Sequence, residues 1–154
     1  LVTCSSIGPC AELAAQMTSV PVLRIDEPMA REAAARGGRI GVVATLGSTL
    51  EPTADIVERC ARQAGQQVSV QRVLCFGAFE AASEGRQEEH DRIVLAGLQG
   101  LLDEGVQTVV LAQASMARVA NLLPQPTPVP ILSSPRSGIV RAGDVLHRLR
   151  LYTE

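Results

Sequence analysis

A continuous apolar run at residues 39–45 (RIGVVAT) constrains the fold more than any other segment of the chain. Gly37 and Gly38 precede it and Gly47 follows it, so the run has the length of a strand and not that of a helix. Apolar residues at consecutive positions indicate a strand that is buried on both faces, which is typical of parallel sheets covered by helices. The run therefore predicts an α/β fold.

Strand and helix patterns alternate along the whole chain, which predicts a mostly parallel sheet. The predicted strands cover residues 21–25, 39–45, 67–74, 106–112 and 129–132. The predicted helices cover residues 9–17, 29–36, 51–64, 86–104, 116–122 and 136–149, and residues 75–85 are predicted to form a loop. Leu1 and Val2 have the character of the last residues of a further buried strand.

Composition excludes several classes of function. Net charge is −2 with both signs mixed, and no stretch of 18 apolar residues occurs, so we expect neither a nucleic-acid partner nor a membrane span. All 14 basic residues are arginine, which excludes a Schiff-base lysine and a Walker A lysine. Aromatic residues make up 2% of the chain, so the core must consist of Ala, Val, Leu and Ile.

The four cysteines are scattered, without a C-x-x-C pair: Cys4, Cys10, Cys60 and Cys75. With His90 and His147 as the two histidines, this spacing predicts no metal site. A disulfide scaffold is not expected in a chain of this length, and no signal peptide is expected either, so the predicted compartment is the cytoplasm.

Most of these residues are predicted to be structural. We expect Cys10 and Cys60 to pack within helices and Cys75 to end a strand with a lesser chance of a role in a site. His90 lies among acidic residues and is predicted to be solvated, and His147 is predicted to lie at the surface near the end of the last helix.

Small polar residues follow three of the predicted strands. Parallel sheets bind ligands beyond the carboxyl ends of their strands, where hydroxyls and helix N–H groups can hold an anion. Cys4 lies at such an end before a predicted helix, a setting that favours the thiolate, so it is the candidate base or nucleophile. The candidate binding residues at the three strand ends are Ser5, Ser6, Thr45, Ser48, Thr49, Gln113, Ala114 and Ser115.

Three segments together give the chain a family resemblance: residues 3–6 (TCSS), residues 41–49 (GVVATLGST) with the helix after them, and residues 104–117 (EGVQTVVLAQASMA). In their order and spacing they resemble the aspartate/glutamate/hydantoin racemase superfamily, which includes arylmalonate decarboxylase and maleate isomerase relatives. The resemblance implies two similar Rossmann-like α/β lobes with the active site between them and no cofactor. It is compatible with a homodimer.

The resemblance also implies a division of the chain and a chemistry. Residues 29–117 would form the second lobe, and residues 1–28 and 118–154 the remainder of a first lobe that is incomplete at its N-terminus. In this family two cysteines, one from each lobe, exchange the proton α to a carboxylate of a small substrate. Cys4 matches the first cysteine, and Thr45 with Ser48 or Thr49 matches the carboxylate-binding turn.

Gln113 occupies the position where the second cysteine is expected, and an amide cannot exchange a proton near neutral pH. Ser115 would need an activating base to replace the missing thiol. A one-base reaction therefore fits better than symmetric racemisation: decarboxylation, isomerisation or proton transfer in one direction. Two alternatives remain: a carboxylate-binding or sensor protein of this fold, and a flavodoxin-like domain with an unrelated ligand.

Overall fold

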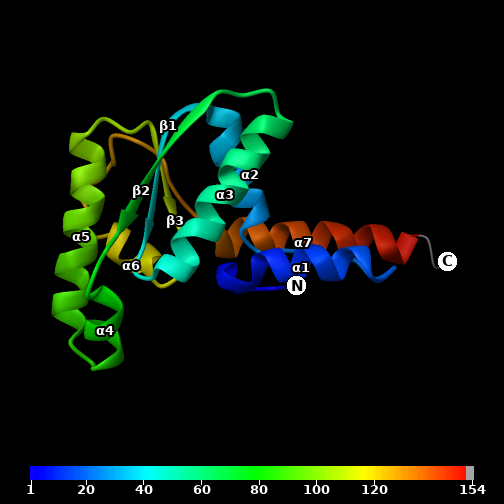
Figure 1. Cartoon of the computed structure of the whole chain (residues 1–154), viewed down its shortest axis with the longest axis horizontal. Helices are drawn as coiled ribbons and strands as arrows, with labels where there is room; N and C mark the ends of the chain where they lie inside the picture. Colours follow the sequence, from blue (N-terminus) through cyan, green and yellow to red (C-terminus); the bar gives the residue numbers. More distant parts are fainter. Residues whose placement is uncertain (152–154) are drawn as a thin grey trace.

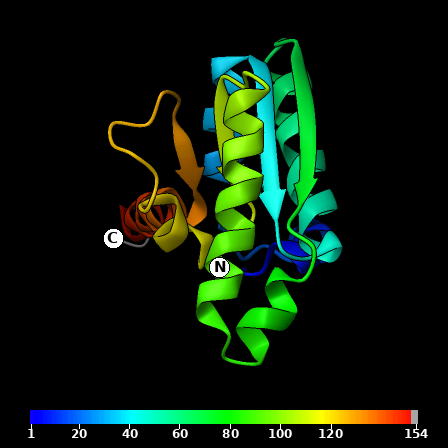
Figure 2. The same ribbon diagram turned by 90° about the vertical axis from the view of Figure 1, so that its left-hand side faces the viewer.

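The structure is a computed structural model that describes residues 1–151, with side chains described as far as Leu149. Within these residues, four strands form one fully parallel sheet (Figures 1 and 2). In spatial order they are β2 (Val68–Leu74), β1 (Gly38–Ala44), β3 (Thr108–Leu111) and β4 (Ile131–Ser133). The predicted α/β class and parallel sheet are confirmed.

Helices cover both faces of the sheet. On one face lie α2 (Glu27–Arg36) and α3 (Gly47–Gln63). On the other lie α4 (Ala78–Ser83), α5 (Gln87–Asp103) and α6 (Met116–Ala120) (Figures 1 and 2). Across residues 1–151, no helix combines the length and apolar character needed to cross a membrane.

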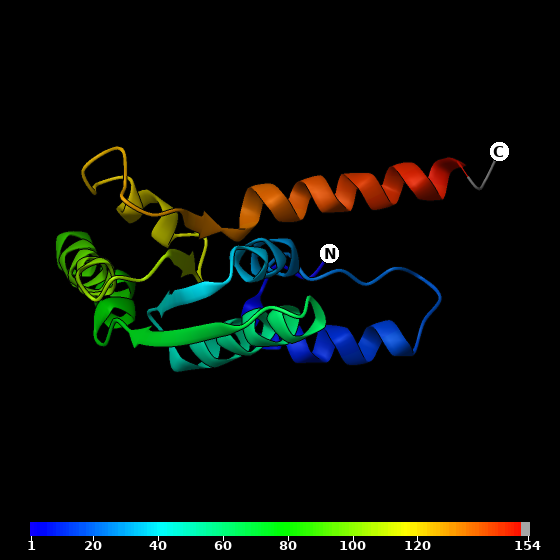
Figure 3. The ribbon, with the colours of Figure 1, turned by 90° about the horizontal axis from the view of Figure 1, so that it is seen from above.

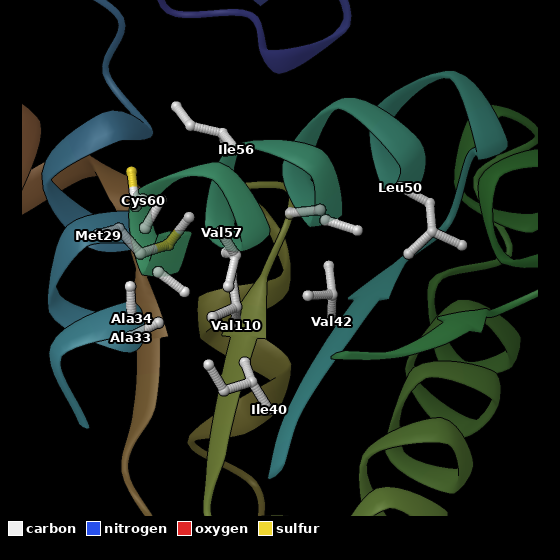
Figure 4. Close-up of a cluster of buried hydrophobic side chains, with 14 of the residues drawn as sticks. Met29, Ala33, Ala34, Ile40, Val42, Leu50, Ile56, Val57, Cys60 and Val110 are labelled. Carbon is white, nitrogen blue, oxygen red and sulfur yellow. The ribbon is translucent and has the colours of Figure 1, made fainter. Parts of the chain in front are cut away.

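Strand β1 shows why its sequence is apolar at consecutive positions. Ile40 and Val42 face α2 and α3 and pack there with residues such as Met29 and Val57 (Figure 4). Val43 points to the opposite face, among the residues of α5 and α6. Because side chains alternate along a strand, a strand covered on both faces must be apolar at every position.

The order of the strands creates a switch point at β1. The chain runs from β1 through α3 to β2, and then returns through α5 to β3 on the other side of β1. The two crossover helices lie on opposite faces, so the connections diverge between β1 and β3. In open α/β sheets, ligands bind outside the carboxyl ends of the strands at this switch point.

The two ends of the chain form a flank beside this sheet. A 3-10 turn (Ser5–Ile7) leads into α1 (Gly8–Gln16), and after β4 the chain continues as α7 (Ser134–Leu151). Both helices project away from the sheet in the same direction (Figures 1 and 3). α7 contacts α2, and it approaches Ile25 so closely at Gly138 that a Cβ there would lie 2.6 Å from the Ile25 carbonyl oxygen.

Two predicted elements and the start of one helix were wrong. Residues 21–25 do not form a strand. Among the described residues they make one isolated parallel bridge, between Arg24 and Val2, which is too short a pairing to count as a strand. The predicted loop at 75–85 contains α4, which follows Gly77 with its positive φ and buries Ala78 and Ala81. Helix α3 begins at Gly47, earlier than predicted, because the amides of Thr49 and Leu50 already donate to the Leu46 carbonyl.

Candidate active site

The ends of β1 and β3 are joined by a pair of side chains at the switch point. Thr45 follows β1 directly, and Gln113 lies two residues beyond β3. The Thr45 amide donates to Gln113 Oε1 at 2.7 Å, and the Thr45 hydroxyl donates to the same oxygen at 3.1 Å. Gln113 Nε2 in turn donates to Thr45 Oγ1 at 2.8 Å. Two residues predicted to belong to one site are therefore in direct contact.

The segment that carries Cys4 lies beside the start of α3. The hydroxyls of Ser6 and Thr49 are hydrogen-bonded at 3.1 Å, although the two residues lie in different parts of the chain. Cys4 is exposed and has an extended backbone immediately before the turn at Ser5–Ile7. The start of α3 comes directly after Thr45 and Leu46, so the Cys4 segment and the Thr45–Gln113 pair flank the same helix terminus.

The remaining predicted site residues divide by exposure. Ser5 and Thr49 are buried, whereas Ser48, Ala114 and Ser115 are exposed. The first amides of α3 and the hydroxyls of Ser48 and Thr49 are the groups that can hold a carboxylate, because helix N-termini offer unpaired N–H donors and a favourable dipole.

The other cysteines are unsuited to proton transfer, or lie elsewhere. Burial raises the pKa of Cys75 to about 11, and its sulfur packs so closely on Gly97 that a Cβ there would lie 2.8 Å away. Burial likewise raises the pKa of Cys60, which lies in the core as predicted. Cys10 is exposed, so the prediction that it packs within a helix was wrong.

His90 also differs from its prediction. It is buried on α5, and its Nδ1 lies 2.8 Å from Asp91 Oδ1 and 3.1 Å from Gln87 Nε2. The apolar side of α5 faces the sheet, and His90 falls on that side despite its acidic neighbours in sequence. Among the residues that the structure describes, no three His, Cys, Asp or Glu side chains come together as a metal site would require.

Sequence reasoning missed an ion-pair network beside the Cys4 segment. Arg24 is buried and binds Asp26 with two hydrogen bonds, of 2.9 and 2.8 Å, while its third nitrogen binds Glu12 on α1 at 2.5 Å. Glu12 also accepts a hydrogen bond of 2.8 Å from Arg59 on α3. The R-x-D spacing was an available signal, since side chains two residues apart share one face of an extended segment.

The model of the Asp/Glu/hydantoin racemase family matches residues 1–142. The chain belongs to this family. A glutamate racemase from Geobacter metallireducens is 35% identical over 116 residues, which cover 72% of this chain and 42% of that protein. This member of the family thus spans less than half the length of the curated relative that it matches.

Solved structures agree on the fold. A glutamate racemase isoform from Bacillus anthracis superposes with a TM-score of 0.72 at 19% identity, covering 94% of this chain and 56% of that one. A Francisella tularensis glutamate racemase in complex with D-glutamate gives 0.72 at 15% identity, covering 96% and 56%. At these identities the likeness establishes the fold alone.

Proposed function

We propose that this racemase-family chain provides the acid–base site of a cofactor-independent enzyme that acts at the carbon α to a carboxylate, with Cys4 as the acid or base. The observation that carries the proposal is the Ser6–Thr49 hydrogen bond, which brings the Cys4 segment to the start of α3. That start lies at the switch point where folds of this type bind their ligands.

In the proposed step, the Cys4 thiolate removes the α proton. An S–H bond forms, the Cα–H bond breaks, and the electron pair moves into the substrate carboxylate as an enediolate. The Ser48 and Thr49 hydroxyls and the first amides of α3 donate to the carboxylate oxygens, whose negative charge increases during the step. Donors fixed where charge develops lower the barrier more than they favour the ground state.

Gln113 supports a reaction that uses one thiol. It stands where the family resemblance expects the second cysteine, and its amide can neither take nor return a proton near neutral pH. Its oxygen accepts two hydrogen bonds from Thr45, which holds the side chain in the site. We therefore propose decarboxylation, isomerisation or proton transfer on one face in preference to symmetric racemisation.

For the substrate we propose a small carboxylate, with glutamate as the first compound to test. The family match and the 35% identical glutamate racemase support an amino acid. Aspartate, hydantoins and 2-aryl malonates are the further members of the proposed class.

Proton exchange in deuterated water tests the proposal. Each panel compound is incubated with wild type, Cys4→Ser and Cys10→Ser, and the α-proton signal and any loss of carbon dioxide are followed by NMR. We expect exchange or decarboxylation with wild type and Cys10→Ser, and at least a 10³-fold loss with Cys4→Ser. No reaction of any compound with wild type, or full activity of Cys4→Ser, would refute the proposed role.

The contact between Gln113 and Thr45 also favours a second candidate, a carboxylate-binding protein without turnover. Calorimetric binding of L- or D-glutamate that Thr49→Val abolishes, with no exchange in deuterated water, would support it. Rapid alkylation of Cys4 by iodoacetamide would count against it, since a binding protein has no need of a reactive thiol.

A further inference from the structure

The segment that carries Cys4 is held at both of its ends by one stretch of chain around Arg24. Before Cys4, the Val2 amide donates to the Leu23 carbonyl at 2.7 Å, and the Ile25 amide donates to the Val2 carbonyl at 2.9 Å. After Cys4, Gly8 lies against the side chain of Arg24. The backbone of this stretch therefore fixes one end of the Cys4 segment, and the Arg24 guanidinium contacts the other.

Any other residue at Gly8 would displace the Arg24 side chain from its present position. A Cβ at this position would lie 2.7 Å from Arg24 Nε and would overlap the rest of the guanidinium. Gly8 is the first residue of α1, so the guanidinium sets how closely the start of α1 approaches the Arg24 stretch. The side chain of Arg24 therefore packs against the end of the turn that follows Cys4.

The guanidinium itself is fixed by two carboxylates. Asp26 is almost fully buried and binds two of the Arg24 nitrogens, and Glu12 of α1 binds the third. Planar guanidinium–carboxylate pairs of this kind define an orientation as well as a distance. Asp26 directly precedes α2, so the Arg24–Asp26 pair links the Cys4 segment to a helix that covers the sheet.

Glu12 extends the network to α3. Arg59 of α3 binds both oxygens of Glu12, one of them at 2.8 Å. Burial alone would raise the pKa of Glu12, but hydrogen bonds from Arg59 and Arg24 outweigh it and lower the pKa. Glu12 is therefore ionised near neutral pH, and it joins α1 to the same helix whose first turn is hydrogen-bonded to Ser6.

We infer that Arg24 is a positioning residue for Cys4: together with Asp26, Glu12 and Arg59 it holds the thiol-bearing turn in register with the start of α3. The inference rests on the proposed function, in which Cys4 must meet a substrate bound at that helix terminus. Small misplacements of a reacting group can cost about 100-fold in rate, so the network acts on turnover and not on substrate affinity.

Two substitutions and a matched control test this role. Arg24→Lys keeps the charge but cannot form the planar pair with Asp26, and Arg59→Met removes the link to α3 at a half-exposed position. Arg36→Met is the control, since Arg36 makes an exposed pair with Glu32 on α2, away from Cys4. Urea unfolding identifies which variants are folded, and Arg59→Met decides the question if Arg24→Lys does not fold.

The first readout is kinetic, on the panel compound that wild type exchanges fastest. We expect kcat to fall about 100-fold in Arg24→Lys and about 10-fold in Arg59→Met, with KM within about twofold of wild type. Arg36→Met should keep both constants. A kcat within twofold of wild type in every folded variant of the network would overturn the inference, as would a loss confined to KM.

The second readout does not need turnover. Hydrogen exchange of the backbone amides in residues 5–16 should rise at least tenfold in Arg24→Lys and Arg59→Met, with β1 and β3 unchanged, and should not rise in Arg36→Met. If wild type turns over none of the compounds, the proposed function fails. Hydrogen exchange still tests whether the Arg24 network holds residues 5–16 in place. Unchanged exchange in residues 5–16 would then overturn the positioning role by itself.

Discussion

The sheet and the flank of this molecule are held together by different kinds of contact. In the sheet, β1 and β3 are buried on both faces, and apolar side chains fill the space to the helices (Figure 4). The flank consists of residues 1–26 and α7, which lie beside the sheet (Figure 3). Its position depends on the bridge between Val2 and Arg24, on the ion pairs of Arg24 and on the close contacts at Gly8 and Gly138.

The difference matters because the proposed chemistry lies where the two regions meet. Apolar packing gives the sheet its stability, but it tolerates substitutions of similar volume and so specifies position weakly. Hydrogen-bonded ion pairs add little net stability, yet they fix orientation. Cys4 comes from the flank and the start of α3 from the sheet, so the flank's polar contacts govern their alignment.

The largest effect should come from a cavity in the sheet. Ile40 is fully buried on β1, so Ile40→Ala should lower the free energy of unfolding by about 3 kcal/mol. Ile139 on α7 is largely exposed, and Ile139→Ala should change it by less than about 0.5 kcal/mol. Urea denaturation measures both, and equal losses would contradict the difference between the sheet and the flank.

A smaller effect should separate two glycines of α7. Alanine normally stabilises a helix by about 1 kcal/mol relative to glycine. A Cβ at Gly143 meets open space, so Gly143→Ala should stabilise by roughly that amount, whereas Gly138→Ala should destabilise by about 1–2 kcal/mol because its Cβ collides with Ile25. Thermal unfolding of the two variants should therefore shift in opposite directions, and a rise in both would show that α7 does not press on Ile25.

A substitution at the Thr45–Gln113 contact should change the free energy of unfolding less than it changes activity. Thr45→Val removes the hydroxyl that contacts both polar atoms of Gln113, which should cost about 1 kcal/mol in the free energy of unfolding and lower proton exchange at least tenfold. Thr53→Val is the matched control, because its buried hydroxyl binds the Thr49 carbonyl within α3. A parallel loss of activity in Thr53→Val would indicate a general effect of buried threonines.

The smallest effect is a pH dependence within the sheet region. Burial raises the pKa of Cys75 from 9.0 to about 11, so the folded state keeps the thiol protonated after the unfolded state has lost its proton. The stabilisation is complete below pH 9 and is lost as the pH rises towards 11. By pH 10 the free energy of unfolding has fallen by about 1 kcal/mol. Cys75→Ala should show a weaker decline between pH 8 and 10 in urea titrations, and an identical decline would place the titrating group elsewhere.

Local patterns predicted the sheet well because β1 and β3 lie in continuous apolar runs and β2 alternates between apolar and polar residues. The run at 39–45 and the strand at 67–74 match β1 and β2 to within one residue, and Thr45 and Gln113 were expected at strand ends. Helix α4 escaped prediction because six residues are too few to show a helical period.

The flank could not be predicted in the same way. Its geometry depends on pairs of residues that are distant in sequence, such as Gly8 with Arg24 and Gly138 with Ile25. A glycine in a helix gives no local sign that a neighbour needs its missing Cβ. The contact between Arg24 and Asp26 was within reach of sequence reasoning, but its extension through Glu12 to Arg59 required the structure.

The central claim is that one thiol, Cys4, works on one face of the substrate while Gln113 occupies the other. The most direct test follows deuterium incorporation into the separate enantiomers of glutamate, or of the panel compound that exchanges fastest, with chiral analysis of the products. We expect deuterium in one enantiomer with retained configuration, loss of this exchange in Cys4→Ser, and new interconversion of enantiomers in Gln113→Cys. Equal incorporation into both enantiomers with inversion by wild type, or undiminished exchange in Cys4→Ser, would contradict it.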